Sequence, residues 1–444
     1  MASDLTAAAK ALAAACAAVR DAGPADAVAG VRPSFAASPA GTAEASALLH
    51  AAAEHALAVV VRGSGSRLGW GGPPARCDLV IDTLRMDQVI EHASGDLVAR
   101  VQAGARMGRL AGTLATAGQQ VALDAPPGST VGGVIATGLA GPRRLRYGTP
   151  RDLLIGITVV RADGTVAHSG GKVVKNVAGY DLGKLFAGSF GTLGLVTEAT
   201  FRLHPLPAAS AFVTAEFGAA ASTAAVASAV ASAARSPLLA SAVELILDRS
   251  LRVAVLLDGS PGGVAERARR MADLLGAASF PAPEVDISAT EPGWWGAPLA
   301  FGGEGGGEGP AGREGREGML VRIAFWVSAL ERVLDTIRAS ARRAGIRPAV
   351  GGSAGAGVLY ARLGPATEPD AAAAFVTGLR ESLAHARGSV TVLAAPPGSV
   401  PPGSTPAVGG MPGTVPALAL MRAVKDQFDP GHLLAPGRFP EGRS

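Results

Sequence analysis

The sequence predicts a mixed α/β protein built from two or three structural units. Its 444 residues exceed what one simple core accommodates. Hydrophobic residues make up 48% and charged residues 17%, which is typical of a globular chain and excludes general disorder. Aromatic residues make up only 4%, so we expect cores of Val, Leu, Ile and Ala, as in tightly packed α/β proteins.

Charge and cysteine content exclude several classes of function. The formal net charge is +4, and the basic residues form no block with interleaved aromatic residues, which argues against a nucleic-acid surface. Cys16 and Cys77 alone cannot hold an iron–sulfur cluster or a zinc ion, and they favour a reducing compartment. No run of about 18 apolar residues could span a bilayer. We therefore expect a cytoplasmic protein, with any membrane association made through a partner.

The N-terminal half alternates helices and short strands. The Ala-rich run LTAAAKALAAACAAV lacks the basic start of a signal peptide, so it predicts a helix. Gly118 is expected to end a later helix. The other predicted elements are a helix over 44–57, strands in 58–65, 78–83 and 97–104, a helix over 107–118, irregular structure over 124–142, a hairpin over 153–166 that turns at 163–164, and a strand over 194–207.

After residue 207 the glycine loops stop, and residues 210–258 and 319–395 carry alternating strand and helix patterns. Two low-complexity stretches, 301–318 and 396–413, are expected to be surface loops. A last helix is predicted in PALALMRAVKDQF, ahead of a distinctive tail.

Two glycine-rich loops predict an anion site. GSGSRLG at 63–69 departs from the dinucleotide pattern in its spacing and in the residues that follow it. Its backbone amides can still form a nest for a phosphate. The second loop, PPGSTVGGVIATG at 126–138, adds the hydroxyl donors of Ser129 and Thr130. Tight turns without a ligand are the alternative, but two such loops favour the two ends of one large anionic cofactor.

Five segments, in order, resemble the flavoprotein superfamily of vanillyl-alcohol oxidase and p-cresol methylhydroxylase (PCMH). Within this superfamily, the KNVAGYDLxKL pattern and the closing APGRF most resemble the FAD-binding E subunits of bacterial glycolate oxidases. The resemblance covers residues 30–207 densely and 416–440 again. The segments are VVVRGSGSR, PPGSTVGG, RRLRYGTPRDLL, GGKVVKNVAGYDLGKLFAGSFGTLG and KDQFDPGHLLAPGRF.

The resemblance implies an α+β fold, with a two-subdomain PCMH-type FAD-binding domain and a ferredoxin-like α+β cap domain. The expected organisation is an Ala-rich helical extension over 1–29, the FAD-binding domain over 30–207, the cap over 208–413 with a mobile Gly/Glu-rich loop at 301–318, and a C-terminal segment over 414–444 that returns to the FAD-binding domain.

The resemblance also implies FAD as the cofactor, held without a covalent bond because no histidine lies beside the first loop. That loop would take the pyrophosphate, the second loop the flavin and ribityl chain, and the GTLG turn the adenine side. Lys175 belongs to a group of three of the chain's five lysines, and we expect its amine near the flavin. The predicted cofactor-binding residues are Arg62, Gly63, Ser64, Gly65, Ser66, Pro127, Gly128, Ser129, Thr130, Gly132, Gly133, Thr137, Lys175, Tyr180, Gly191, Gly194, Val196 and Arg438.

No catalytic residue and no metal site are predicted. Related catalytic subunits carry a segment resembling GHxGDGNxH in the cap, whereas this chain has VGGSAGAGVLYARL at 350–363, without His, Asn or an acid. The seven histidines form no pair with metal-binding spacing. Phe190 and Ala435 stand where relatives usually have Glu and Asn. These departures favour an accessory FAD subunit.

Three hypotheses for function follow from the resemblance. The first is an FAD-binding subunit of a multi-subunit glycolate oxidase, which converts glycolate to glyoxylate with a catalytic flavoprotein subunit and an iron–sulfur subunit as partners. The alternatives are a self-sufficient FAD-dependent D-2-hydroxy acid dehydrogenase, such as one acting on D-lactate or glycolate, and a non-redox scaffold that holds FAD.

The basic cluster of Arg143, Arg144 and Arg146 with Tyr147 could face FAD phosphates, the substrate or a partner.

Overall fold

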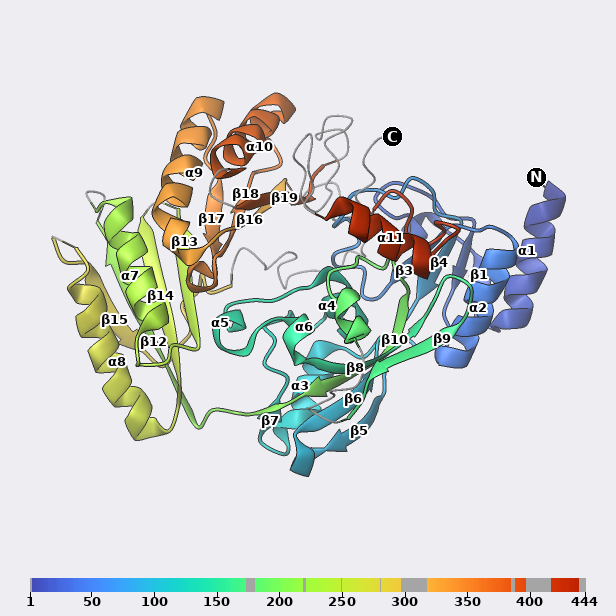
Figure 1. The fold of residues 1–444 in the computed structure, drawn as a ribbon, viewed down its shortest axis with the longest axis horizontal. Coiled ribbons are helices and arrows are strands. Elements are labelled where there is room, and N and C mark those ends of the chain that lie inside the picture. The colour runs from blue at the N-terminus through green and yellow to red at the C-terminus, as the bar shows by residue number, and fades with distance from the viewer. Residues whose placement is uncertain are drawn as a thin grey trace.

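The computed structural model describes residues 2–172, 180–218, 221–248, 250–279, 281–296, 318–384, 388–396 and 417–438. Two domains lie side by side in Figure 1, the first built around the N-terminal half and the second, the cap domain, around strands β12–β19. The predicted loops at 301–318 and 396–413 lie almost wholly outside the described residues, so they stay predictions.

The first domain contains two sheets, and the smaller one has the strand order β1-β2-β4-β3. Strands β2, β4 and β3 run parallel and β1 is antiparallel to β2. Helices α1 and α2 pack together against this sheet through alanine and leucine side chains, as the low aromatic content predicted. The elements are α1 (Ala2–Ala15), β1 (Val19–Asp21), β2 (Phe35–Ala37), α2 (Thr42–Glu54), β3 (Val59–Arg62) and β4 (Leu79–Asp82).

The second sheet of the first domain is antiparallel, with the order β5-β6-β10-β8-β9. A two-stranded ribbon of β7 and β11 lies beside it. The elements are β5 (Val89–Ala93), β6 (Val98–Gln102), α3 (Met107–Ala115), β7 (Gln119–Gln120), α4 (Val131–Thr137), α5 (Arg144–Tyr147), α6 (Pro150–Leu153), β8 (Leu154–Val160), β9 (Val166–Gly170), β10 (Leu195–Arg202) and β11 (His204–Pro205).

Most predicted elements of this domain are confirmed, including the hairpin of β8 and β9, but the expectation of irregular structure over 124–142 was wrong. Helix α4 lies inside that stretch. The Thr130 side chain accepts a hydrogen bond from the Gly133 amide and caps the helix, and Gly138 ends it at φ 62°. The apolar positions of this short helix, Val131, Val134 and Ile135, are buried, which offsets the poor helix propensity of its glycines.

Two further expectations need adjustment. The N-terminal 29 residues are not only a helical extension, because β1 joins the parallel sheet as an edge strand. The helix predicted over 107–118 ends at Ala115, and Gly118 instead takes a left-handed φ of 66° in the turn that follows.

The cap domain repeats the β-α-β-β-α-β pattern of a ferredoxin-like unit twice. The two halves join through β13 and β17 into one antiparallel sheet with the order β15-β12-β14-β13-β17-β18-β16-β19. The first half contains β12 (Ala209–Phe217), α7 (Thr223–Arg235), β13 (Ala242–Leu247), β14 (Leu251–Gly259), α8 (Pro261–Gly276) and β15 (Glu284–Ser288). The second contains β16 (Leu320–Ala324), α9 (Leu330–Ala344), β17 (Ala349–Gly352), β18 (Val358–Arg362), α10 (Pro369–Ala384) and β19 (Ser389–Ala394).

The two faces of the cap sheet have different neighbours. Helices α7 to α10 cover one face, and the other faces the first domain (Figure 1). Leu320, Tyr360 and Leu393 lie on this second face, and they pack in one hydrophobic cluster with Trp70 and Leu139 of the first domain. The apolar contact fixes the cap sheet over the first domain.

The tail returns to the first domain after α11 (Leu418–Phe428). Backbone hydrogen bonds join Val59 of β3 to Leu433 and Ala435, each with an N···O distance of 2.8 Å. The C-terminal segment thereby extends the edge of the parallel sheet beside β3.

A buried carboxyl group lies where the cap meets the first domain. Glu244 of β13 is 2% exposed, and its Oε1 accepts a hydrogen bond of 2.6 Å from the Ser353 hydroxyl. The same hydroxyl lies 3.3 Å from the carbonyl oxygen of Gly141 in the first domain. Burial raises the pKa of Glu244 to about 8, although the Ser353 hydrogen bond opposes the shift.

Replacing Glu244 with Gln is expected to make stability less dependent on pH. The native pKa lies above the unfolded value, so the native state holds a proton that the unfolded state releases, and stability falls as pH rises between pH 5 and 8. Gln cannot titrate, so the E244Q variant should lose this dependence of stability on pH. The measurement is the free energy of unfolding in urea at several pH values between 5 and 8. The exposed E284Q on β15 is the control and should keep the wild-type slope. An unchanged slope in E244Q would refute the burial argument.

Candidate functional site

A cavity opens between the two sheets of the first domain. Its walls come from the loop after β3, from the region around α4, from the turn before β10 and from the tail. The lining residues are Val61, Gly63, Ser64, Gly65, Ser66, Arg67, Leu68, Trp70, Thr83, Ser129, Thr130, Gly132, Gly133, Ala136, Thr137, Ser189, Phe190, Gly191, Gly194, Val196 and Arg438.

The two glycine-rich loops meet at Gly63 and Thr130. A Cβ atom on Gly63 would lie 2.1 Å from Oγ1 of Thr130, so only glycine permits this approach. Gly132 is similarly constrained, because its Cβ would lie 2.9 Å from the Cβ of Ala103. The loops therefore present bare backbone to the cavity, as a close-fitting ligand with phosphate groups requires.

Hydroxyls and one cation line the loop side of the cavity. The Ser64 and Ser66 hydroxyl oxygens lie 3.2 Å apart. Nη1 of Arg67 donates to Oγ of Ser129 at 3.0 Å, which connects the first loop to the second. The Arg67 guanidinium also lies 5.4 Å from the ring centroid of Trp70. Backbone amides, hydroxyls and a guanidinium suit the two negative charges of a diphosphate, so these residues fit an FAD-type cofactor.

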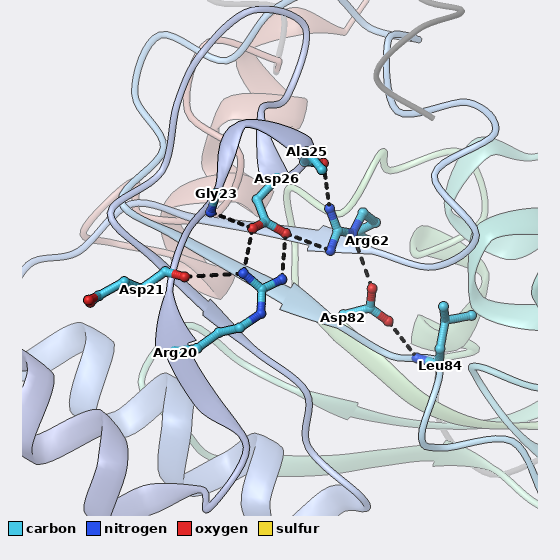
Figure 2. Close-up of polar contacts among 8 residues, drawn as sticks. All are labelled: Arg20, Asp21, Gly23, Ala25, Asp26, Arg62, Asp82 and Leu84. Carbon is cyan, nitrogen blue, oxygen red and sulfur yellow. Dashed lines mark hydrogen bonds and ion pairs between the residues drawn. The ribbon is translucent and has the colours of Figure 1, made fainter. Parts of the chain in front are cut away.

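Arg62, by contrast, points away from the cavity into an ion-pair network (Figure 2). Its guanidinium lies 3.0 Å from Asp26 and 3.1 Å from Asp82. Asp26 also accepts hydrogen bonds of 2.7 and 2.9 Å from Arg20 and of 2.8 Å from the Gly23 amide. The pKa of the buried Asp26 carboxyl lies well below its usual range, mainly because of the hydrogen bonds from Arg20 and then because of those from Gly23 and Arg62. The network ties the N-terminal segment to the strand that carries the first loop.

The tail fixes the opposite wall through a buried lysine. Lys425, 2% exposed, donates from Nζ to the Thr192 carbonyl at 2.7 Å and to the Leu434 carbonyl at 3.1 Å. It also pairs with Asp429 at 2.5 Å. Arg438 donates to the carbonyls of Leu68 and Gly72 and lines the cavity itself. The tail thus holds both the loop after β3 and the turn before β10.

Some predicted cofactor residues lie outside the cavity walls. Pro127 and Gly128 lie against α3 and the residue before it. The Pro127 carbonyl accepts a hydrogen bond of 2.9 Å from the Gly108 amide, and the Gly128 carbonyl accepts one of 2.6 Å from the Arg106 side chain. Tyr180 is 92% exposed. Lys175 lies outside the described residues.

The other two lysines of the group containing Lys175 form ion pairs away from the cavity. Lys172 pairs with Glu91 at 2.5 Å and Lys184 with Asp181 at 3.2 Å. The sequence reasoning missed eight lining residues, although the flanks of its quoted motifs contained several of them. They are Val61, Arg67, Leu68, Trp70, Thr83, Ala136, Ser189 and Phe190.

The described ranges contain no group of three His, Cys, Asp or Glu side chains placed to hold a metal ion. Within the same ranges, no helix combines the length and apolar character that a bilayer crossing needs.

His204 packs edge-on against Tyr147, with the ring centroids 4.8 Å apart. Burial lowers the pKa of His204, and the positive charges of Arg202 and Arg146 lower it further.

Comparison with known proteins identifies the ligand class. Residues 33–170 match the protein family described as FAD binding domain, so the chain carries an FAD-binding domain. It is 41% identical over 175 residues to glycolate oxidase subunit GlcD of Bacillus subtilis (38% of this chain, 36% of that protein). It is 36% identical over 155 residues to glycolate oxidase subunit GlcE of Escherichia coli (34% of this chain, 44% of that protein). The matches thus span less than half of either relative.

The fold is that of the PCMH-type flavoproteins. The structure of p-cresol methylhydroxylase with substrate bound aligns with a TM-score of 0.75 and covers 99% of this chain and 97% of that one. At 16% sequence identity, this similarity concerns the fold alone.

Substituting Gly63 with Ala is expected to weaken FAD binding by about 10- to 100-fold, because overpacking costs about 1–3 kcal/mol. The new methyl group would force Thr130 and the second loop away from the first. Titration of the apoprotein with FAD measures the effect. The matched control is G69A, whose Cβ would meet no atom within 4 Å. Equal affinity of G63A and wild type would contradict the close-approach model.

Substituting Asp26 with Asn is expected to lower the free energy of unfolding at pH 7 by about 2 kcal/mol, the scale of hydrogen bonds to charged groups. The native pKa of Asp26 is depressed, so its contribution is present above the unfolded pKa and is lost as pH falls into the acid range. The difference between D26N and wild type should therefore shrink at acid pH in urea titrations. A difference that stays constant as pH falls would contradict the depressed pKa of Asp26.

Proposed function

We propose that this chain is the FAD-binding subunit of a multi-subunit glycolate oxidase. In this proposal it works with a catalytic flavoprotein subunit and an iron–sulfur subunit to oxidise glycolate to glyoxylate. The observation that carries the proposal is the pairing of an FAD-binding cavity with a cap whose β17–β18 segment contains no His, Asp or Glu. Two relatives that are named glycolate oxidase subunits support it.

When bound, FAD supplies the redox chemistry, and the protein supplies position and charge. We assign the diphosphate to the amides of Gly63–Ser66, the hydroxyl of Ser129 and the guanidinium of Arg67. Trp70 and Phe190 supply apolar surface to the cofactor, and Arg438 closes the cavity from the tail.

Oxidation of a 2-hydroxy acid needs a base for the hydroxyl proton. The cap segment 350–363 contains no His, Asp or Glu. Glu244 hydrogen-bonds to Ser353 and does not line the FAD-binding cavity. This favours a catalytic partner over the self-sufficient dehydrogenase.

Electron transfer points to a second partner. Cys16 and Cys77 are both buried and unbridged, and two thiols cannot hold an iron–sulfur cluster. Electrons would therefore leave the complex through another subunit, for which an iron–sulfur protein is the fitting class.

The experiment compares the purified chain with the complex under anaerobic conditions. The chain alone should retain FAD and keep its visible flavin absorption when glycolate or D-lactate is added, whereas the complex should be reduced by glycolate. Reduction of the chain alone would establish the self-sufficient dehydrogenase instead. Absence of a co-purifying subunit with cysteine clusters would favour the scaffold, and absence of FAD from every preparation would overturn all three hypotheses.

A further inference from the structure

The residues that follow the first glycine-rich loop connect the cavity to the cap. Arg67, at the start of this stretch, donates from Nη1 to the Ser129 hydroxyl at 3.0 Å and lines the cavity. Further along, the amide of Gly71 donates to the carbonyl of Leu393 in β19 at 3.1 Å. Segment 67–72 therefore touches the cofactor cavity at one end and the cap sheet at the other.

The cap strand is shaped for this contact. Val392 and Ala394 pair with successive residues of β16, so Leu393 between them is the extra residue of a β-bulge. The bulge leaves the Leu393 backbone outside the ladder with β16, and its carbonyl is available to Gly71. Gly71 has a left-handed φ of 85°, a conformation that glycine adopts without strain.

Two overlapping turns and the tail make segment 67–72 stiff. The amide of Trp70 donates to the Arg67 carbonyl at 3.0 Å, and that of Gly72 donates to the Gly69 carbonyl at 3.3 Å. Arg438 of the tail donates from Nε to the Gly72 carbonyl at 3.1 Å. Because the two turns overlap, a shift of the segment at the cap displaces Arg67 in the cavity.

Trp70 connects the two ends of the segment through its ring. It is 5% exposed and belongs to the same hydrophobic cluster as Leu320, Tyr360 and Leu393 of the cap. Its ring centroid lies 5.4 Å from the Arg67 guanidinium. A buried aromatic ring attracts the charge of a guanidinium beside it and restricts where that group points. The cap thus holds the ring, and the ring holds Arg67.

We propose that Trp70 is a positioning residue for the cofactor, which keeps Arg67 directed at the FAD diphosphate while the cap is docked on segment 67–72. The inference rests on the proposed function for the assignment of the diphosphate to Arg67. FAD affinity is then coupled to cap docking, and by reciprocity bound FAD stabilises the docked cap.

A double-mutant cycle on FAD affinity tests the role of Trp70. Titration of the apoprotein with FAD should give binding about 10-fold weaker in W70L and about 10- to 100-fold weaker in R67M. The double variant should bind within about 2-fold of R67M, because Trp70 acts through Arg67. W70F keeps an aromatic face and should recover most of the affinity that W70L loses. The matched control is W326L, since Trp326 of the cap is 66% exposed and lies outside the cavity walls.

Two further measurements test the coupling to the cap. Leu393 does not line the cavity, yet L393A should weaken FAD binding by about 3-fold or more and have no effect in the R67M background. Bound FAD should slow amide hydrogen exchange in segment 67–72 and in β19. Circular dichroism identifies variants that have not folded, and W70F and L393A keep the test decisive if W70L is among them.

Wild-type affinity in W70L would overturn the proposal. Equal losses from W70L in the wild-type and R67M backgrounds would also overturn it, because they would show that Trp70 acts independently of Arg67. Amide exchange in β19 that FAD leaves unchanged would refute the coupling to the cap. Wild-type affinity in R67M would remove the diphosphate assignment and the positioning role with it. The expected cycle in a chain that forms no complex with partner subunits would sustain the positioning role while the proposed function fails.

Discussion

The close approach of Gly63 to Thr130 is the constraint on which the rest of the first domain depends. Gly63 follows β3 and Thr130 precedes α4, and their contact leaves no space for a side chain at position 63. Because the loop follows β3 directly, any shift of that strand would open the contact. Three attachments hold the strand: its pairing with β4, the ion pairs of Arg62 and the backbone hydrogen bonds of the tail.

The cap domain presents the face of one continuous sheet to the first domain, and this face carries few reactive groups. Its two ferredoxin-like halves form one sheet, with helices on one side and the first domain on the other. The polar residues on the inner face, Glu244 and Arg322 among them, reach the seam only because two strands of different halves carry them into one plane.

The sequence predicted β3, β4, β6, β8, β9 and β10, several of the long helices and both glycine-rich loops, because glycine spacing and apolar periodicity are local signals. It did not predict the short strands β1, β2, β5 and β7 or the helix α8. It failed where the outcome depended on distant residues. Helix α4 was missed because its stability comes from burial against other elements and overrides weak propensity. Arg62 was assigned to the cofactor, yet the alternation of a strand sends Val61 into the cavity and Arg62 toward Asp26.

The pairing of β3 with the tail has a consequence for the order of events during synthesis. A ribosome releases β3 among the first sixty or so residues, but Leu433, Ala435 and Arg438 emerge only after the whole cap has been made. Until then the nascent chain lacks one wall of its cavity and the edge that secures the first loop. The cavity therefore reaches its final form only after the cap and the segment that follows it have been made.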